Sequence, residues 1–186
     1  IFSTKDINQL FKIIKEHNLL MLQPAFDSRG KISYEETRAH PFSYLRYTNF
    51  IEMTCPLFKY EVIDSFMKVY DPKLVGWGID WWIVDHLGDV DHNRIAIIDA
   101  ITCINPHDKT KKNNREIDNL QKSEIRQKIW NEVKVEYKLK CDSYKVIVYG
   151  GIKIFNLFGL VKSIKVCCIN KFFKLRYKIS FYCYGN

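Results

Sequence analysis

The sequence contains no apolar run long enough to form a membrane-spanning helix. Such a helix needs about 20 consecutive apolar residues, and the longest candidate, residues 146–161, is interrupted by Lys153 and by three glycines. The opening residues 1–10 also lack the basic start and the apolar stretch of a secretory signal peptide. We therefore expect no transmembrane segment in this part of the protein.

Cysteine is present, but not in the patterns that identify a metal site or a disulfide framework. The six cysteines include no C-x-x-C pair and no regular spacing, which favours reduced thiols over a zinc site. Reduced cysteines favour a cytoplasmic protein, and a Golgi or membrane-anchored protein stays open as an alternative. The sequence also lacks the P-loop, GxGxxG, GxSxG and HExxH motifs, so nothing indicates the enzyme classes that these motifs identify.

Negative charge is almost missing from the C-terminal quarter of the chain. Residues 141–186 hold eight basic residues against the single acid Asp142, a balance of +7, while the whole chain carries +8. We therefore separate a basic, aromatic tail, residues 141–186, from a domain formed by residues 1–140. A basic tail is compatible with binding to nucleic acid or to an acidic membrane surface. It contains no arginine cluster, so we expect no specific nucleic acid partner and rank this function last.

The remaining composition is that of a folded α/β domain. A chain of 186 residues with 47% hydrophobic residues can bury a substantial core. Helical spacing of apolar residues occurs in three segments, 3–18, 59–70 and 122–140, and a short helix is predicted at 80–88. Strand character occurs in the segments 19–24, 44–58 and 94–100. This alternation predicts the α/β class, and the polar segment 27–41 reads as a loop or a lid.

The first and last helices have predicted details. Ser3 and Asp6 form an N-terminal capping signature, and Pro24 is expected to end the strand that follows the first helix. The predicted buried faces are Ile7, Leu10, Phe11 and Ile14 in the first helix, and Ile125, Ile129, Val133 and Tyr137 in the last.

The most unusual stretch is LVGWGIDWW, residues 74–82, which holds three of the four tryptophans. Glycine lets a ligand approach the backbone closely, and Trp77 between Gly76 and Gly78 offers a flat apolar face to a sugar or a nucleobase. Asp80 has two interpretations: it caps the helix that follows, or it acts as a general base in a pocket. Spacing alone favours the cap, and at least one of Trp81 and Trp82 is expected to be ordinary core.

Several polar residues elsewhere are weaker candidates. Arg46 and Asn49 share a predicted strand, where Arg46 is suited to hold a phosphate or a carboxylate, although a structural ion pair is the plainer interpretation. Asp99 lies near the end of a strand. His107 is a candidate ligand for a divalent metal or a phosphate, although a lone loop histidine is usually solvated. The acids and histidines of residues 85–92 fit no tight metal spacing and favour an exposed turn.

Six segments together resemble one protein family. They are DINQLFKI, LQPAF, HPFSYLRYTNFIEMTCPLF, GWGIDWW, RIAIIDAITCINPH and REIDNLQ. In this order they are similar to a family of uncharacterised glycosyltransferase-like proteins of bacteria and plants that carry a domain of unknown function. The resemblance covers residues 1 to about 140 and does not extend into the tail.

The resemblance implies a glycosyltransferase-A-like α/β fold that binds a nucleotide-sugar donor and a carbohydrate acceptor. By this analogy Trp77 stacks on the sugar, Asp80 is the catalytic carboxylate, and His107 completes a Mn²⁺ or Mg²⁺ site. Gly76, Gly78, Trp81, Arg46 and Asn49 are then candidate substrate-binding residues. The resemblance thus reverses the preference at Asp80 in favour of a role in the site.

One departure from the family pattern affects the expected activity. Proteins of this fold usually carry an acidic D-x-D-like motif before a segment like STKDINQLF, and the residues before Ser3 do not supply it. We therefore expect this chain to be the C-terminal part of a larger enzyme whose nucleotide-binding half precedes it, and to be inactive by itself. The alternative function is a non-catalytic carbohydrate-binding domain, which would need Trp77 but not Asp80.

Overall fold

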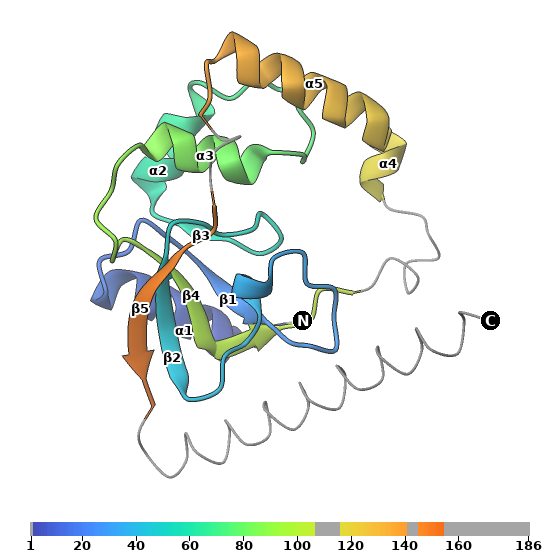
Figure 1. The fold of residues 1–186 in the computed structure, drawn as a ribbon. Coiled ribbons are helices and arrows are strands. Elements are labelled where there is room, and N and C mark those ends of the chain that lie inside the picture. The colour runs from blue at the N-terminus through green and yellow to red at the C-terminus, as the bar shows by residue number, and fades with distance from the viewer. Residues whose placement is uncertain (1, 107–115, 141–144, 155–186) are drawn as a thin grey trace, which may run out of the picture.

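The computed structural model describes residues 2–106, 116–140 and 145–154. Five strands form one mixed sheet in the order β3-β1-β4-β2-β5 (Figure 1). They are β1 (Met21–Phe26), β2 (Ser43–Thr48), β3 (Leu57–Phe58), β4 (Ile95–Cys103) and β5 (Val148–Lys153). The central strands β1 and β4 run parallel, and the other neighbouring strands are antiparallel. The chain is therefore an α/β protein.

Helices cover the sheet in two groups. They are α1 (Thr4–Glu16), α2 (Tyr60–Met67), α3 (Ile79–Leu87), α4 (Glu116–Leu120) and α5 (Ser123–Glu136), with a short 3-10 helix, η1 (Glu35–Thr37). The first helix packs on a face of the sheet through its buried apolar residues. Helices α2, α3 and α5 share a second core with the first residues of β1 and β4, and they lie across that end of the sheet (Figure 1). The predicted helices, including the short one at Asp80, are confirmed.

The predicted capping signature of α1 is confirmed. The Oγ of Ser3 accepts a hydrogen bond from the backbone N–H of Asp6, and the Asp6 carboxylate accepts one from the backbone N–H of Ser3, both at 3.1 Å. This reciprocal pair satisfies two N–H groups that the helix leaves without an internal partner.

The buried face of α1 differs from the predicted one. Leu10, Ile13 and Ile14 are buried, whereas Ile7 and Phe11 are largely exposed. The helix carries more apolar residues than one face can hold. Its C-terminal half docks on the sheet and selects the face around Ile13.

The buried face of α5 is also rotated from the prediction. Arg126, Trp130 and Val133 are buried, while Ile125 and Tyr137 are exposed. The indole of Trp130 is the largest apolar group on this helix, so burying it outweighs burying isoleucine. Val133 belongs to the predicted buried face and also to the observed one.

Strand β1 continues through Pro24, so the predicted end at that residue is wrong. The register between β1 and β4 shifts between Pro24, opposite Ile98, and Ala25, opposite Thr102. Proline cannot donate to a ladder and is tolerated where a bulge interrupts the pairing. The irregularity therefore lets the strand continue to Phe26.

Two other segments also differ from simple strands. The predicted strand 44–58 is divided into β2 and the two-residue β3, with an irregular loop between them. In the tail, β5 pairs with β2 and joins the edge of the sheet. The rest of the tail, residues 141–144 and 155–186, lies outside the described residues. Among the helices described, none has the length and the apolar character to span a bilayer.

Candidate active site

Six separate parts of the chain meet at a cleft of about 360 Å³. It lies between the loop before η1, the loop after β2, the start of α3, the end of β4 and the helices α4 and α5. Its chemistry comes from Glu52, Trp77, Asp80, Asn105 and Arg126. Two of these five, Trp77 and Asp80, are the residues predicted to bind the sugar and to act as the base.

Asp80 lies in the first turn of α3, two residues after the N-cap Gly78. Its Oδ1 accepts the backbone N–H of Trp81 at 3.0 Å. Burial raises the pKa of the Asp80 carboxyl to about 6, because the lowering effect of the backbone hydrogen bonds is smaller than the cost of desolvating the anion. The carboxylate therefore accepts a hydrogen bond at the helix start and also lines the cleft.

A second carboxyl, that of Glu52, lines the same cleft. The Oγ1 of Thr37 donates to it at 3.0 Å, and the Glu52 backbone N–H donates to the Oε1 of Gln23 at 2.5 Å. Burial raises the pKa of Glu52, and the nearby charge of Asp80 raises it further. Sequence reasoning missed Glu52 as a site residue. The available signal was a lone acid within the apolar run FIEM.

Trp77 is 42% exposed in the cleft because of a turn that only glycine forms easily. Gly76 and Gly78 have φ of 75° and 80°, in the left-handed region that disfavours other residues. A Cβ on Gly78 would lie 2.3 Å from the indole of Trp130, and one on Gly76 would lie 2.5 Å from Ile117. The two glycines thus permit close packing within the protein, and their turn carries Trp77 to the surface.

The two other tryptophans of this segment have different surroundings. Trp82 is 2% exposed and belongs to the main core, so the prediction that at least one tryptophan is core is confirmed. Trp81 is half-buried: its Nε1 donates to the Tyr34 hydroxyl at 3.2 Å, and its ring lies 4.3 Å from that of Phe50. Trp81 thus belongs to an aromatic cluster next to Asp80.

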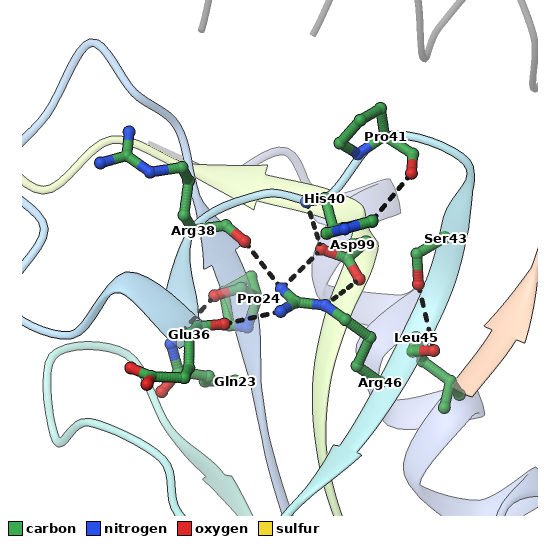
Figure 2. Close-up of polar contacts among 10 residues, drawn as sticks. All are labelled: Gln23, Pro24, Glu36, Arg38, His40, Pro41, Ser43, Leu45, Arg46 and Asp99. Atoms are coloured by element: carbon green, nitrogen blue, oxygen red, sulfur yellow. Dashed lines mark hydrogen bonds and ion pairs between the residues drawn. The ribbon is translucent and has the colours of Figure 1, made fainter. Parts of the chain in front are cut away.

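Arg46 lies outside the cleft, in a buried ion pair with Asp99 that Figure 2 shows. The Arg46 Nε and Nη2 donate to the two carboxylate oxygens at 2.8 and 2.9 Å, and Nη1 and Nη2 also donate to the carbonyls of Glu36 and Arg38. The Asp99 carboxylate additionally accepts the backbone N–H of His40. The plainer interpretation of Arg46, a structural ion pair, matches this geometry.

Asn49 also lies away from the cleft. Its side chain donates to the carbonyl of Lys145 and accepts the N–H of Ile147, both at 2.8 Å. These bonds hold the segment that leads into β5. His107 lies outside the described residues.

Two cationic side chains complete the cleft. Arg126 is buried, and its Nη2 donates to Asp118 at 2.5 Å. Its Nε is buried without a hydrogen-bond partner in the described part of the chain. Lys31 lies on the opposite loop. The cleft thus presents positive charge, negative charge and an indole to a ligand.

The described residues do not form a metal site by themselves. In residues 2–106, 116–140 and 145–154, no three His, Cys, Asp or Glu side chains converge as a metal ion requires. The acids and histidines of residues 85–92 do not converge in this way either.

No family model matches this chain, and no match was found among the curated proteins or the solved structures compared with it.

Proposed function

We propose that the cleft around Asp80 binds a carbohydrate and that the protein acts in glycosyl transfer. The observation that carries this proposal is an exposed indole, that of Trp77, in the same cleft as a half-buried carboxyl whose pKa is about 6. A general base works best when its pKa lies near the pH of the reaction. The Asp80 carboxyl is ionised at pH 7 and is a stronger base than an ordinary aspartate.

In the proposed reaction, the Asp80 carboxylate accepts the proton of an acceptor hydroxyl. The hydroxyl oxygen then bonds to the anomeric carbon of the donor sugar while the bond from that carbon to the nucleotide diphosphate breaks. The diphosphate leaves with the bonding electrons. Glu52, which lines the same cleft and whose pKa is also raised, would hydrogen-bond a neighbouring hydroxyl of the acceptor.

The remaining groups of the cleft suit a sugar. The apolar face of Trp77 packs against the C–H face of a pyranose ring, and Asn105 offers an amide to a hydroxyl. A volume of about 360 Å³ lies in the range of small-molecule sites. Lys31 and Arg126 favour an acceptor or a donor that carries negative charge.

The finer assignment, a glycosyltransferase-A-like fold with a nucleotide-sugar donor and Mn²⁺ or Mg²⁺, is supported by the ordered sequence segments. The mixed α/β sheet is compatible with it. The family carries its D-x-D-like motif before a segment like STKDINQLF, and residues 1–2 do not supply it, so the proposal assigns no donor or metal site to the described residues.

The test compares Asp80→Asn with Trp77→Ala in the natural full-length protein. Binding is measured by saturation-transfer NMR with a panel of sugars, and transfer is measured with radiolabelled nucleotide-sugars. We expect Asp80→Asn to retain sugar binding and to lose about 100-fold or more of the transfer rate. We expect Trp77→Ala to weaken sugar binding. Asp64→Asn and Tyr60→Ala, both on the exposed side of α2, are the matched controls.

Each result decides between the functions. Sugar binding that depends on Trp77, with transfer that survives Asp80→Asn, would contradict the base role. Binding without any transfer would favour the alternative, a non-catalytic carbohydrate-binding domain. Sugar binding that is unchanged in Trp77→Ala would contradict both functions.

A further inference from the structure

We propose that Cys55 and Cys103 form a redox-active dithiol, which a low-molecular-weight disulfide converts into an internal disulfide bond. The two Sγ atoms lie 3.3 Å apart, although the residues are 48 positions apart in the sequence. Both cysteines are free and half-buried. A small reagent can therefore reach a pair of thiols that the fold already holds together.

The surrounding backbone limits how far the two thiols can separate. Cys103 is the last residue of β4, where it pairs with Phe26 of β1 in the centre of the sheet. Cys55 lies two residues before β3, which pairs with the other side of β1. A disulfide has an S–S length of about 2.05 Å. The sulfurs need to approach by only about 1.3 Å, a distance that side-chain rotation can supply.

The hydrogen bond between the thiols gives them different roles. The two Sγ atoms share a hydrogen bond, which lowers the pKa of the Cys55 thiol and raises the pKa of the Cys103 thiol. The thiolate is the attacking species in thiol–disulfide exchange. Cys55 is therefore the first nucleophile, and Cys103 resolves the intermediate.

The reaction balances with the disulfide reagent as the oxidant. The Cys55 thiolate attacks one sulfur of the reagent, the S–S bond of the reagent breaks, and one thiolate leaves. Cys103 loses its proton and attacks the sulfur of Cys55, which expels the second thiolate. The two cysteines are oxidised to one disulfide, and one reagent molecule is reduced to two thiols.

The disulfide would link two sides of the cleft. Thr54 precedes Cys55 directly, and Asn105 follows Cys103 by two residues; both line the cleft. Oxidation would fix these two segments to each other. This consequence does not depend on which ligand the cleft binds.

The experiment exposes the full chain to oxidised glutathione and records the intact mass and the linked peptides after proteolysis. We expect the wild-type chain to lose two hydrogen atoms, to yield a peptide pair joined through Cys55 and Cys103, and to recover both on treatment with dithiothreitol. Two glutathione adducts at these residues, or no reaction at either, would overturn the proposal. The peptide map needs no variant and so remains decisive if substitutions impair folding.

A pair of variants tests the assigned roles. Cys103→Ser keeps a hydroxyl donor beside Cys55, whereas Cys103→Ala removes it. We expect the alkylation of Cys55 by iodoacetamide, followed site by site by mass spectrometry, to need a higher pH in the Ala variant than in the Ser variant. Identical pH profiles would show that Cys103 does not activate Cys55 and would overturn the assigned order.

Discussion

At the scale of the residue, Asp80 shows two opposing electrostatic effects. An acid in the first turn of a helix is normally stabilised as an anion by the exposed N–H groups. Here the backbone hydrogen bonds do lower the pKa of the carboxyl, but burial raises it by a larger amount, to about 6. A carboxylate held in this way is costly to the fold, which is typical of residues kept for chemistry.

This cost predicts a stability gain in Asp80→Asn. The native pKa of about 6 exceeds the ordinary value of 3.8, so between about pH 4 and pH 6 the native protein binds more protons than the unfolded chain. The free energy of unfolding of the wild type is therefore highest, as far as Asp80 contributes to it, below pH 4. This contribution is lost as the pH rises through 6. We expect the asparagine variant to be more stable by about 1–3 kcal/mol at pH 7, measured by urea denaturation.

The advantage of the variant should disappear below about pH 4, where Asp80 is protonated in both states. The control is Asp64→Asn, whose carboxylate is exposed and has a pKa lowered by its hydrogen bond to Lys68. That variant should gain nothing at pH 7. Equal stability of Asp80→Asn and the wild type across this range would show that the carboxyl is not desolvated.

Residues that act through distant partners are the ones that the sequence could not reveal. Asp80 and Trp77 stand out because glycine and tryptophan are unusually concentrated around them. Glu52 has no such marker, because its role depends on the approach of Asp80 and Thr37 from other parts of the chain. The contact of Cys55 with Cys103 is likewise formed by strand order and not by spacing.

At the scale of the element, the start of α3 is fixed by its packing against α5. The backbone at Gly78 turns into the left-handed region, and the space beside its Cα is filled by the ring of Trp130. Because the same turn precedes Asp80, the position of the carboxyl depends on this contact between the helices.

We therefore expect Gly78→Ala to destabilise the protein strongly. The left-handed backbone costs a non-glycine residue about 1–2 kcal/mol, and the overlap with Trp130 adds about 1–3 kcal/mol of overpacking. The control is the same substitution in a Trp130→Leu background, where the ring that would overlap the added Cβ is absent. A smaller loss of urea midpoint for Gly78→Ala in that background would isolate the packing contribution, and equal losses would contradict it.

Periodicity identified the helices but not the faces they bury. In α1 and α5 the apolar residues cover a wider arc than the face that each helix buries, so more than one orientation satisfies the pattern. The choice is made by the partner: the sheet selects Ile13, and the glycine turn before α3 selects Trp130. Tertiary packing, and not the spacing of apolar residues alone, therefore determines which face of each helix is buried.

At the scale of the whole molecule, the ion pair of Arg46 and Asp99 joins three separate segments. It connects β2 to β4 and holds the loop around η1 through the carbonyls of Glu36 and Arg38 (Figure 2). That loop also carries Lys31 and Ser33 to the cleft. The pair thus supports the site from outside it.

Removing this ion pair should lower the free energy of unfolding of the protein. We expect Arg46→Ala to cost about 3–5 kcal/mol, because it leaves the carboxylate of Asp99 buried and unpaired. Lys68→Ala is the control, since its ion pair with Asp64 lies on the surface and should contribute little. A thermal or urea midpoint for Arg46→Ala as high as that for Lys68→Ala would contradict the structural role.

The overall class was predictable, and the strand order was not. Alternating helices and apolar strands indicate an α/β domain wherever they occur. The order β3-β1-β4-β2-β5 depends on which strand edges meet after the helices have docked. The same limit applies to the cleft, whose residues come from six separate segments.

The central pairing of β1 with β4 also has a consequence for the time course of folding. Met21 lies opposite Ile95, and Arg46 lies opposite Gly151. Residues that lie this far apart in the sequence must come into contact before the sheet can form. A high contact order of this kind slows folding. On the ribosome, Met21 of β1 must wait for 74 further residues before Ile95 of its parallel neighbour β4 emerges. During that interval the apolar side chains of β1 remain exposed, so that they can aggregate or bind a chaperone.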